Sequence, residues 1–232
     1  MVIGGLQKFT LLDYPGKIAA TVFLAGCNFR CPFCYNPELV LPEVIKNTPK
    51  ISERSFFKFL KERKGLLEGI VVCGGEPTIH QDLPLFIKKI KKMGFAVKLD
   101  TNGSNPQMLK KLIDQNLIDY VAMDVKAPKE KYQEVTGGRG DPELIEESIS
   151  ILKSSKIDYE FRTTVVPTLL SKDDILEIVK WISPAKKYFL QNFSPSKHID
   201  ARFNNLKPYP EEYLLEIKKV IEPFFEVCGV RN

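Results

Sequence analysis

Three cysteines lie within eight residues near the start of the chain. Cys27, Cys31 and Cys34 are separated by three and then by two residues. Thiols at this spacing can converge from one loop onto a single metal centre, and thiolates are soft ligands suited to zinc or to iron–sulfur clusters. A structural zinc site needs four ligands, and neither His80 nor His198 lies at a finger-like spacing. An iron–sulfur cluster with one iron open to another ligand therefore fits best, against the alternative of three neighbouring buried thiols.

A second motif, Gly74-Gly75-Glu76-Pro77, follows a short apolar segment. The two glycines let the backbone approach a ligand closely, and Pro77 stiffens the turn. Glu76 supplies a negative partner for an ammonium group. A simple turn between a strand and a helix would explain the glycines but not Glu76, so the motif predicts part of a ligand site.

Charged and polar residues also follow two further apolar segments. Asp100-Thr101-Asn102-Gly103 ends one of them, and Asp124 and Lys126 end the next. Residues two apart on a strand share a face, so Asp124 and Lys126 are expected to point the same way. Charges that face an interior are costly unless they are paired or bound to a ligand. Exposed charges at the ends of strands are the alternative.

The elements that must position these residues alternate along the chain. Short apolar segments rich in β-branched or aromatic residues predict six strands, at 20–25, 69–73, 95–99, 120–125, 159–166 and 187–191. Apolar residues at helical spacing predict helices at 56–67, 85–90, 108–113, 144–152, 175–182 and 213–221. Six such units predict a parallel sheet with right-handed crossovers and are too few for an eight-stranded barrel. The expected fold is α/β, an open partial (β/α)6 barrel with mainly parallel strands, and residues 1–232 are expected to form one domain.

Composition excludes several classes of protein. The 232 residues carry 34 Lys and Arg against 29 Asp and Glu, with 44% hydrophobic residues, which is unlike a disordered chain. No apolar run approaches the roughly 20 residues of a membrane helix, and no secretory signal is evident, so we expect a cytoplasmic protein. Five cysteines are an odd number, and a reducing cytosol would not keep disulfides.

Positive charge is concentrated in the first half of the chain. Residues 1–116 have a net charge of +7 and residues 117–232 a net charge of −2. The excess lies mainly on two predicted helices, as Lys58, Lys61, Arg63, Lys64, Lys88, Lys89, Lys91 and Lys92. These residues could form a docking face for an acidic partner, although a solvated helix face is the simpler interpretation. Binding to nucleic acid is not expected, because no aromatic pattern is interleaved with the lysines.

The two motifs together resemble those of the radical S-adenosylmethionine enzymes. The resemblance rests on Cys27-x3-Cys31-x2-Cys34, with Phe33 before the third cysteine, and on residues 74–77 after the second strand. It implies that the three cysteines hold one 4Fe-4S cluster per chain and that S-adenosylmethionine chelates the fourth iron. It further implies that the methionine amino group binds at Gly74, Gly75, Glu76 and Pro77 and that Phe33 lies at the cofactor site.

The later strand ends resemble those of glycyl-radical-enzyme activases, a branch of that superfamily. This resemblance implies that Asp100, Thr101, Asn102 and Asp124 line a cofactor and cation site and that Lys126 reaches toward the substrate, so that Asp124 and Lys126 are the catalytic candidates. It also implies that Arg162 contacts the cofactor. A buried structural ion pair is the competing interpretation of Arg162.

The opening segment 5–17 and Tyr35-Asn36-Pro37-Glu38-Leu39 are similar to those of anaerobic ribonucleoside-triphosphate reductase activating proteins. The similarity implies an oxidoreductase that reductively cleaves S-adenosylmethionine to a 5′-deoxyadenosyl radical and installs a glycyl radical on a partner enzyme. A flavodoxin- or ferredoxin-like protein is the expected electron donor.

Two other functions remain open. A radical enzyme acting on a small molecule or nucleobase, such as a deazaguanine-type synthase, would share every cofactor motif. A noncatalytic iron–sulfur or zinc binding module is an alternative of a different class. Cys73 is expected to be a core thiol, and two isolated cysteines, Cys73 and Cys228, cannot hold a second cluster. His198 is expected at the surface or behind the ligands rather than among them.

Overall fold

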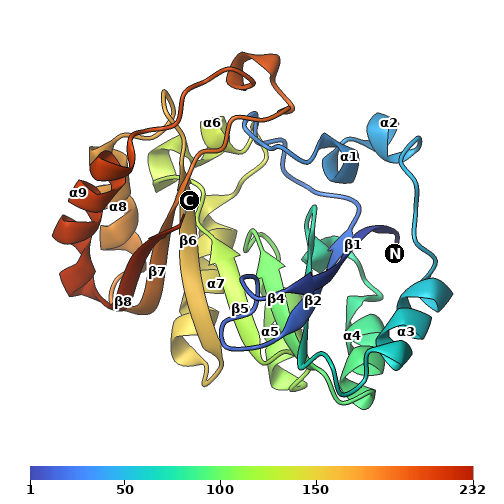
Figure 1. Ribbon diagram of the computed structural model, residues 1–232. Helices are drawn as coiled ribbons and strands as arrows, with labels where there is room; N and C mark the ends of the chain where they lie inside the picture. Colours follow the sequence, from blue (N-terminus) through green and yellow to red (C-terminus); the bar gives the residue numbers. More distant parts are fainter. Residues whose placement is uncertain (232) are drawn as a thin grey trace. The chain divides into compact units, whose positions relative to one another are not determined.

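The computed structural model describes residues 1–231, and the eight strands in this range form one sheet in sequence order (Figure 1). The strands are β1 (Ile3–Thr10), β2 (Ala19–Leu24), β3 (Gly69–Gly74), β4 (Ala96–Thr101), β5 (Tyr120–Asp124), β6 (Asp158–Val165), β7 (Ala185–Asn192) and β8 (Phe225–Arg231). β1 is antiparallel to β2, whereas β2–β3, β3–β4, β6–β7 and β7–β8 are parallel pairs. The expected open, mainly parallel α/β sheet is confirmed. Its six predicted strands are β2 to β7, and β1 and β8 add one strand at each edge.

Helices connect most of the strands. They are α1 (Pro37–Val40), α2 (Pro42–Ile45), α3 (Glu53–Glu62), α4 (Leu83–Lys92), α5 (Pro106–Asp114), α6 (Tyr132–Val135), α7 (Pro142–Ser154), α8 (Lys172–Ile182) and α9 (Glu211–Ile221). The six predicted helices correspond to α3, α4, α5, α7, α8 and α9, although α3 ends at Glu62 and not at residue 67 as predicted. None of the helices within residues 1–231 is long and apolar enough to cross a lipid bilayer.

The two strands that the sequence did not indicate are the edge strands. β1 contains Gly4 and Gly5, and its residues Gln7, Lys8 and Phe9 are exposed. β8 likewise exposes Glu226 and Val227. An edge strand is covered less completely than a central one, so its sequence lacks the continuous apolar run that identifies a buried parallel strand.

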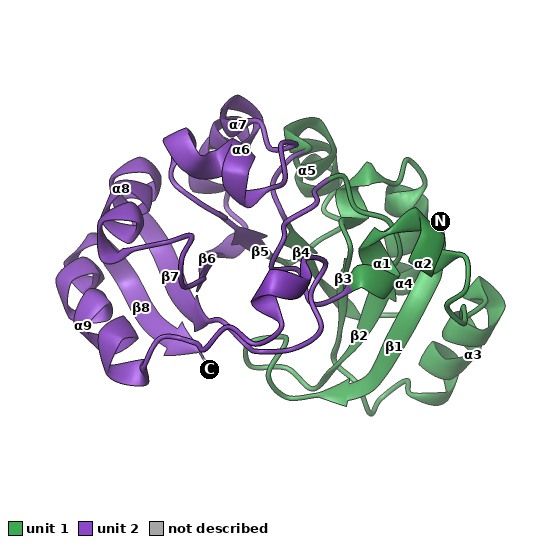
Figure 2. Cartoon of the chain, turned by 90° about the horizontal axis from the view of Figure 1, so that it is seen from above, with its two compact units in different colours: residues 1–28, 37–101, 105–121 green, residues 29–36, 102–104, 122–232 purple. Residues whose placement is uncertain are grey.

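The chain forms two compact units (Figure 2). Unit 1 consists of residues 1–28, 37–101 and 105–121, and unit 2 consists of residues 29–36, 102–104 and the chain from residue 122 onward. Strand β5 begins in unit 1 and ends in unit 2. The expectation that residues 1–232 act as one domain stays a prediction.

Unit 1 packs α3 and α4 together through aromatic side chains. The rings of Phe56 and Phe86 stack with their centroids 5.3 Å apart, and Phe57 meets Phe86 edge-on. Ser52 begins α3 by accepting a hydrogen bond from the Ser55 amide, which satisfies an amide at the start of the helix. The lysines of α3 and α4 thus lie on helices that are packed against each other.

Unit 2 is built on β6 to β8. Tyr188 of β7 is fully buried, and its hydroxyl donates a hydrogen bond to Thr163 Oγ1 of β6 at 2.8 Å. Ser171 and Asp174 form a reciprocal capping box that begins α8. Ile178 of α8 and Leu214 of α9 are completely buried.

Candidate functional site

In unit 1 the turn after β3 lies against the end of β2. The Glu76 amide donates a hydrogen bond to the Gly26 carbonyl at 2.7 Å. A Cβ atom on Gly75 would lie 2.1 Å from that carbonyl oxygen, so only glycine allows this contact. The residue before Cys27 is therefore held directly against the Gly-Gly-Glu-Pro motif.

Gly74 allows a second close approach, between the end of β3 and the end of β2. Its φ is +134°, and a Cβ atom there would lie 2.2 Å from the Leu24 carbonyl oxygen. Both glycines are thus required by the close approach of two backbones.

Glu76 anchors a buried hydrogen-bond network in unit 1. The residue is 1% exposed, and its Oε1 accepts hydrogen bonds from the Thr78 amide at 3.0 Å and from the Thr78 hydroxyl at 2.6 Å. The Thr101 hydroxyl donates to the same oxygen at 2.7 Å. The carboxylate therefore caps the 3₁₀ turn Pro77–Ile79. A turn accounts for Glu76 as well as for the glycines, contrary to the argument from sequence.

Asp100 of β4 is paired with a buried lysine. Lys98, two residues earlier on the same face of the strand, forms an ion pair with Asp100 and is 1% exposed. A buried ammonium requires such a partner. Lys98 was not among the predicted site residues, although its spacing from Asp100 repeats that of Asp124 and Lys126.

In unit 2 the second half of the cysteine loop is a tight turn held by a later segment. The Cys34 amide donates to the Cys31 carbonyl at 3.0 Å. The Ile199 amide donates to the Cys34 carbonyl at 2.9 Å, and the Asp200 amide donates to Pro32 at 3.0 Å. The orientation of this turn is therefore fixed from outside the loop.

In unit 2, Asp124 at the end of β5, Lys126 just after it and Arg162 within β6 form a cluster of three charges, and Lys126 lies near Cys31. Asp124 accepts hydrogen bonds from Lys126 Nζ and from Arg162 Nε, each at 2.8 Å. Burial opposes ionisation of Asp124, but Arg162 and Lys126 outweigh it and hold the pKa of the carboxyl well below its usual range. Burial also opposes the charge on Lys126, yet Asp124 and the nearby Cys31 thiol raise the pKa of the ammonium above its usual value. The competing interpretation of Arg162, a structural ion pair, thus has its partner in Asp124.

Tyr132 of α6 is a further residue beside this group. It is completely buried, and its hydroxyl accepts a hydrogen bond from the Lys126 amide at 3.4 Å. Burial raises the pKa of the phenol well above its usual value, and Cys31 acts in the same direction. Tyr132 could not be predicted as a site residue, because it lies in a polar stretch of the sequence without a motif.

The other predicted site residues of unit 2 are Phe33 and Asn102. Phe33 is 7% exposed and Asn102 is 6% exposed. Asn102 Oδ1 accepts a hydrogen bond from the Ser104 amide at 2.9 Å, which forms a turn after β4. Both residues are therefore part of packed loops.

The predicted residues are divided between the units. Unit 1 holds Cys27, Gly74, Gly75, Glu76, Pro77, Asp100 and Thr101, and unit 2 holds Phe33, Cys31, Cys34, Asn102, Asp124, Lys126 and Arg162. Within residues 1–231, no three His, Cys, Asp or Glu side chains are already gathered as a metal site, and no cysteine forms a disulfide. The donor chemistry nevertheless fits an iron–sulfur cluster, because thiolates are the ordinary ligands of such clusters.

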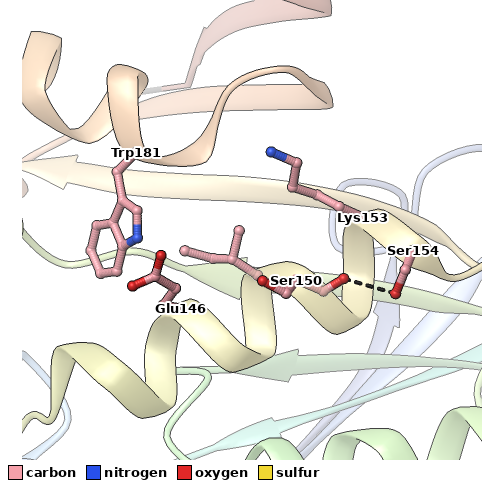
Figure 3. Close-up of a pocket in the computed structure, with 6 residues that line it drawn as sticks. Glu146, Ser150, Lys153, Ser154 and Trp181 are labelled. Atoms are coloured by element: carbon pink, nitrogen blue, oxygen red, sulfur yellow. Dashed lines mark hydrogen bonds between the residues drawn. The ribbon is translucent and has the colours of Figure 1, made fainter.

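A pocket of about 460 Å³ opens between α7 and α8 of unit 2 (Figure 3). It is lined by Glu146, Ile149, Ser150, Lys153, Ser154 and Trp181. The Ser154 hydroxyl donates to the Ser150 carbonyl at 2.8 Å in its wall. None of the site residues predicted from the sequence lines this pocket.

Comparison with known proteins places this chain in a family. The family model described as the radical SAM superfamily matches residues 21–182. A protein of Methanocaldococcus jannaschii, provisionally named a glycyl-radical enzyme activating enzyme, is 34% identical over 237 residues, covering 100% of this chain and 96% of the relative. The pyruvate formate-lyase-activating enzyme of Clostridium pasteurianum is 24% identical over 250 residues, covering 97% of this chain and 100% of that enzyme.

Solved structures show the same fold. A domain of pyruvate-formate lyase-activating enzyme from Bacteroides vulgatus superposes with a TM-score of 0.58 at 14% identity, covering 71% of this chain and 99% of that domain. The family match extends over more than half of the residues, and the Cys27, Cys31 and Cys34 loop lies within it. This chain belongs to the radical SAM superfamily.

Proposed function

We propose that this protein is a glycyl-radical-enzyme activating enzyme, an oxidoreductase acting on a partner of the anaerobic ribonucleotide reductase type. The observation that carries the proposal is the identity of 34% with a relative of that name over the whole chain. A 4Fe-4S cluster and S-adenosylmethionine, the cofactors of the superfamily, would together supply a 5′-deoxyadenosyl radical by reductive cleavage.

The residues of the chain have distinct roles in this proposal. Cys27, Cys31 and Cys34 are the three cluster ligands. Gly74, Gly75, Glu76 and Pro77, with Phe33, Asp100, Thr101, Asn102 and Arg162, form the surroundings of the cofactor. Asp124 and Lys126 act at the substrate, where the Asp124 carboxylate keeps the Lys126 ammonium charged and oriented at 2.8 Å. Such fixed charges stabilise a bound group without reorganisation.

The partners follow from the same proposal. A glycyl-radical enzyme is the protein substrate, and a flavodoxin- or ferredoxin-like protein in the cytoplasm supplies the electron. The full chain acts as one domain. An acidic donor would be attracted to the lysines of α3 and α4.

Formation of 5′-deoxyadenosine tests the proposal. The protein is reconstituted anaerobically with iron and sulfide, mixed with S-adenosylmethionine and dithionite, and assayed by chromatography and mass spectrometry. We expect product from the native chain and from Cys228→Ser, and a loss of at least about 100-fold in Cys31→Ala and Cys34→Ala, because each removes a cluster ligand. Equal product in all four proteins would contradict the ligand assignment.

The substrate is tested with the same preparation. Addition of an anaerobic ribonucleotide reductase should give a glycyl-radical signal by electron paramagnetic resonance. Turnover of a free nucleobase or other small molecule without any protein partner would instead support the deazaguanine-type alternative.

A further inference from the structure

Four residues with oxygen-bearing side chains mark the place where resemblance to the activases implies a bound cation. They are Asp100, Thr101, Asn102 and Asp124. Carboxylate and carbonyl oxygens are suitable ligands for hard cations such as magnesium. Two of the four side chains are carboxylates, so binding of a cation depends on whether their negative charge is available.

In unit 1, the charge of Asp100 is balanced by Lys98. The two residues are two apart on β4 and share a face of the strand, where Lys98 is aligned with Val71 of β3. The Lys98 side chain is 2% exposed and the Asp100 side chain is 12% exposed. The ammonium therefore has little access to solvent, and a metal ion that displaced it from Asp100 would leave a buried charge without its partner.

In unit 2, the charge of Asp124 is balanced by two cations. Its Oδ2 accepts a hydrogen bond from Lys126 Nζ, and its Oδ1 accepts one from Arg162 Nε. One carboxylate and two cations give this cluster a net charge of +1. A metal ion at Asp124 would therefore be repelled by two positive charges at short range.

The two neutral candidates form hydrogen bonds within the chain. The Thr101 hydroxyl donates to Glu76 Oε1 at 2.7 Å, and Asn102 Oδ1 accepts from the Ser104 amide at 2.9 Å. Neither side chain supplies the negative charge that the paired carboxylates lack. The residues of this chain therefore do not fit a bound metal cation, contrary to what the resemblance implies.

We infer that Lys98 is a positioning residue whose ammonium takes the place of a metal cation at Asp100. This inference rests on the proposed function, which assigns Asp100 to the surroundings of the cofactor. The ammonium neutralises the carboxylate and holds it in one orientation before the cofactor binds, so no ion from solution is required. Binding of S-adenosylmethionine should then be independent of the metal ions in the medium.

Equilibrium dialysis of S-adenosylmethionine against the reconstituted native protein tests this independence. The affinity is measured at equal ionic strength in sodium, potassium, magnesium and tetramethylammonium chloride, the last of which supplies no ion that oxygen ligands can coordinate. We expect dissociation constants that agree within about twofold, because screening is the same in all four salts. A larger increase in affinity with any of the three metal ions would overturn the inference.

Lys98→Met should create the dependence that the native protein lacks. Methionine is also unbranched but carries no charge, so Asp100 loses its counter-charge. In tetramethylammonium chloride we expect the affinity for S-adenosylmethionine to fall by about tenfold or more, as for loss of a hydrogen bond to a charged group, and a metal ion should restore it. Equal affinity in all four salts, whether native or reduced, would show that Lys98 does not replace a cation.

Two further variants control for the position of the ion. Lys98→Met combined with Asp100→Asn has no carboxylate at this place, so its affinity should not respond to metal ions. Lys91→Met removes the lysine that pairs with Asp119 at 2.7 Å, where the two side chains are 29% and 39% exposed, and it should behave as the native protein does. A response in either control as large as that of Lys98→Met would contradict the inference.

The possible failures are distinguishable. If Lys98→Met does not fold, the measurement on the native protein still decides between the two outcomes. A native protein that needs a particular metal ion to bind S-adenosylmethionine overturns this inference and leaves the proposed function intact. A native protein with full iron and sulfide that binds no S-adenosylmethionine in any of the salts overturns both.

Discussion

At the scale of single residues, Asp124 balances two cations in unit 2. The Lys126 and Arg162 side chains are only 16% and 12% exposed, and both bind the Asp124 carboxylate. Each positive charge has lost much of its hydration, so its stability in the folded state depends on this anion. Asp124 therefore stabilises the fold, in addition to its proposed role at the substrate.

Asp124→Asn should therefore destabilise the protein strongly. We expect the free energy of unfolding to fall by about 3–5 kcal/mol, because two partly buried cations lose their counter-charge. Urea unfolding of the native protein and the variant at neutral pH measures this loss of free energy of unfolding.

Asp158→Asn is the control for this measurement. Asp158 is 64% exposed and lies 3.9 Å from Lys186, and such a surface pair contributes about 1 kcal/mol at most. Equal losses in the two variants would show that Asp124 does not balance buried charge.

Sequence reasoning located this group only in part. Asp124 and Lys126 stand out because residues two apart share a face of a strand. Lys98 has the same relation to Asp100 and was missed, since an isolated lysine between apolar residues gives no indication of burial. Tyr132 joins the group through folding of the chain after β5, which no local pattern encodes.

At the scale of elements, α8 begins with a capping box that is reinforced from elsewhere. Asp174 Oδ2 accepts hydrogen bonds from the Ser171 amide and from Lys131 Nζ, each at 2.8 Å. Burial raises the pKa of Asp174, but the bonds from Lys131 and Ser171 outweigh it and hold that pKa below its usual value. The ionised carboxylate therefore stabilises the folded state.

The contribution of Asp174 should depend on pH. Since its pKa is lower in the folded state, the stabilisation is present above the ordinary value of 3.8 and is lost as the pH falls through the lowered one. Asp174→Asn should reduce the free energy of unfolding by about 1–2 kcal/mol at neutral pH, and the difference from the native protein should shrink in acid.

Urea unfolding at neutral pH and at low pH provides the comparison. Asp173→Asn is the control, because Asp173 is exposed at the same helix start, and its loss should be about 0.5 kcal/mol. A deficit in Asp174→Asn that persists unchanged in acid would contradict the role of the carboxylate.

Most of the elements could be predicted from sequence. Buried central strands appear in the sequence as continuous apolar runs, and amphipathic helices such as α3 and α4 show apolar residues at a clear helical period. The short helices α1, α2 and α6 were missed because four residues contain too little of a period. The backbone contacts that require glycine at positions 74 and 75 could not be predicted either, since the backbone segments that these glycines approach are distant in sequence.

At the scale of the whole molecule, the positive charge of the first half is carried by neighbouring helices. Lys61, Lys88 and Lys92 are exposed on α3 and α4, and these helices are joined by the stacked Phe56 and Phe86. Some lysines are neutralised locally, as Lys89 is by Glu53. The other exposed lysines of these helices are expected to attract an acidic partner over the Debye length, which is roughly 8 Å at physiological salt.

Reduction of the cluster by an acidic flavodoxin should therefore depend on this face. We expect Lys88→Glu combined with Lys92→Glu to lower the rate of reduction by about tenfold at low salt, and the native rate to fall as salt is added. Stopped-flow absorbance of the cluster follows the reaction.

The control is a double variant that changes the net charge by the same amount on other helices. Lys180→Glu combined with Lys219→Glu alters exposed lysines of α8 and α9. If both double variants slow the reaction equally, or if salt has no effect, the face does not receive the donor.

The order of the strands has a consequence for how the protein is made. Each strand from β2 to β8 lies beside the one that precedes it in the chain. During synthesis a newly emerged strand thus finds its partner already present, and no pairing has to wait for a distant part of the chain. Pairing between consecutive strands keeps the separation of contacting residues shorter than other strand orders of the same sheet would, which limits the time for which an unpaired strand edge is open to aggregation.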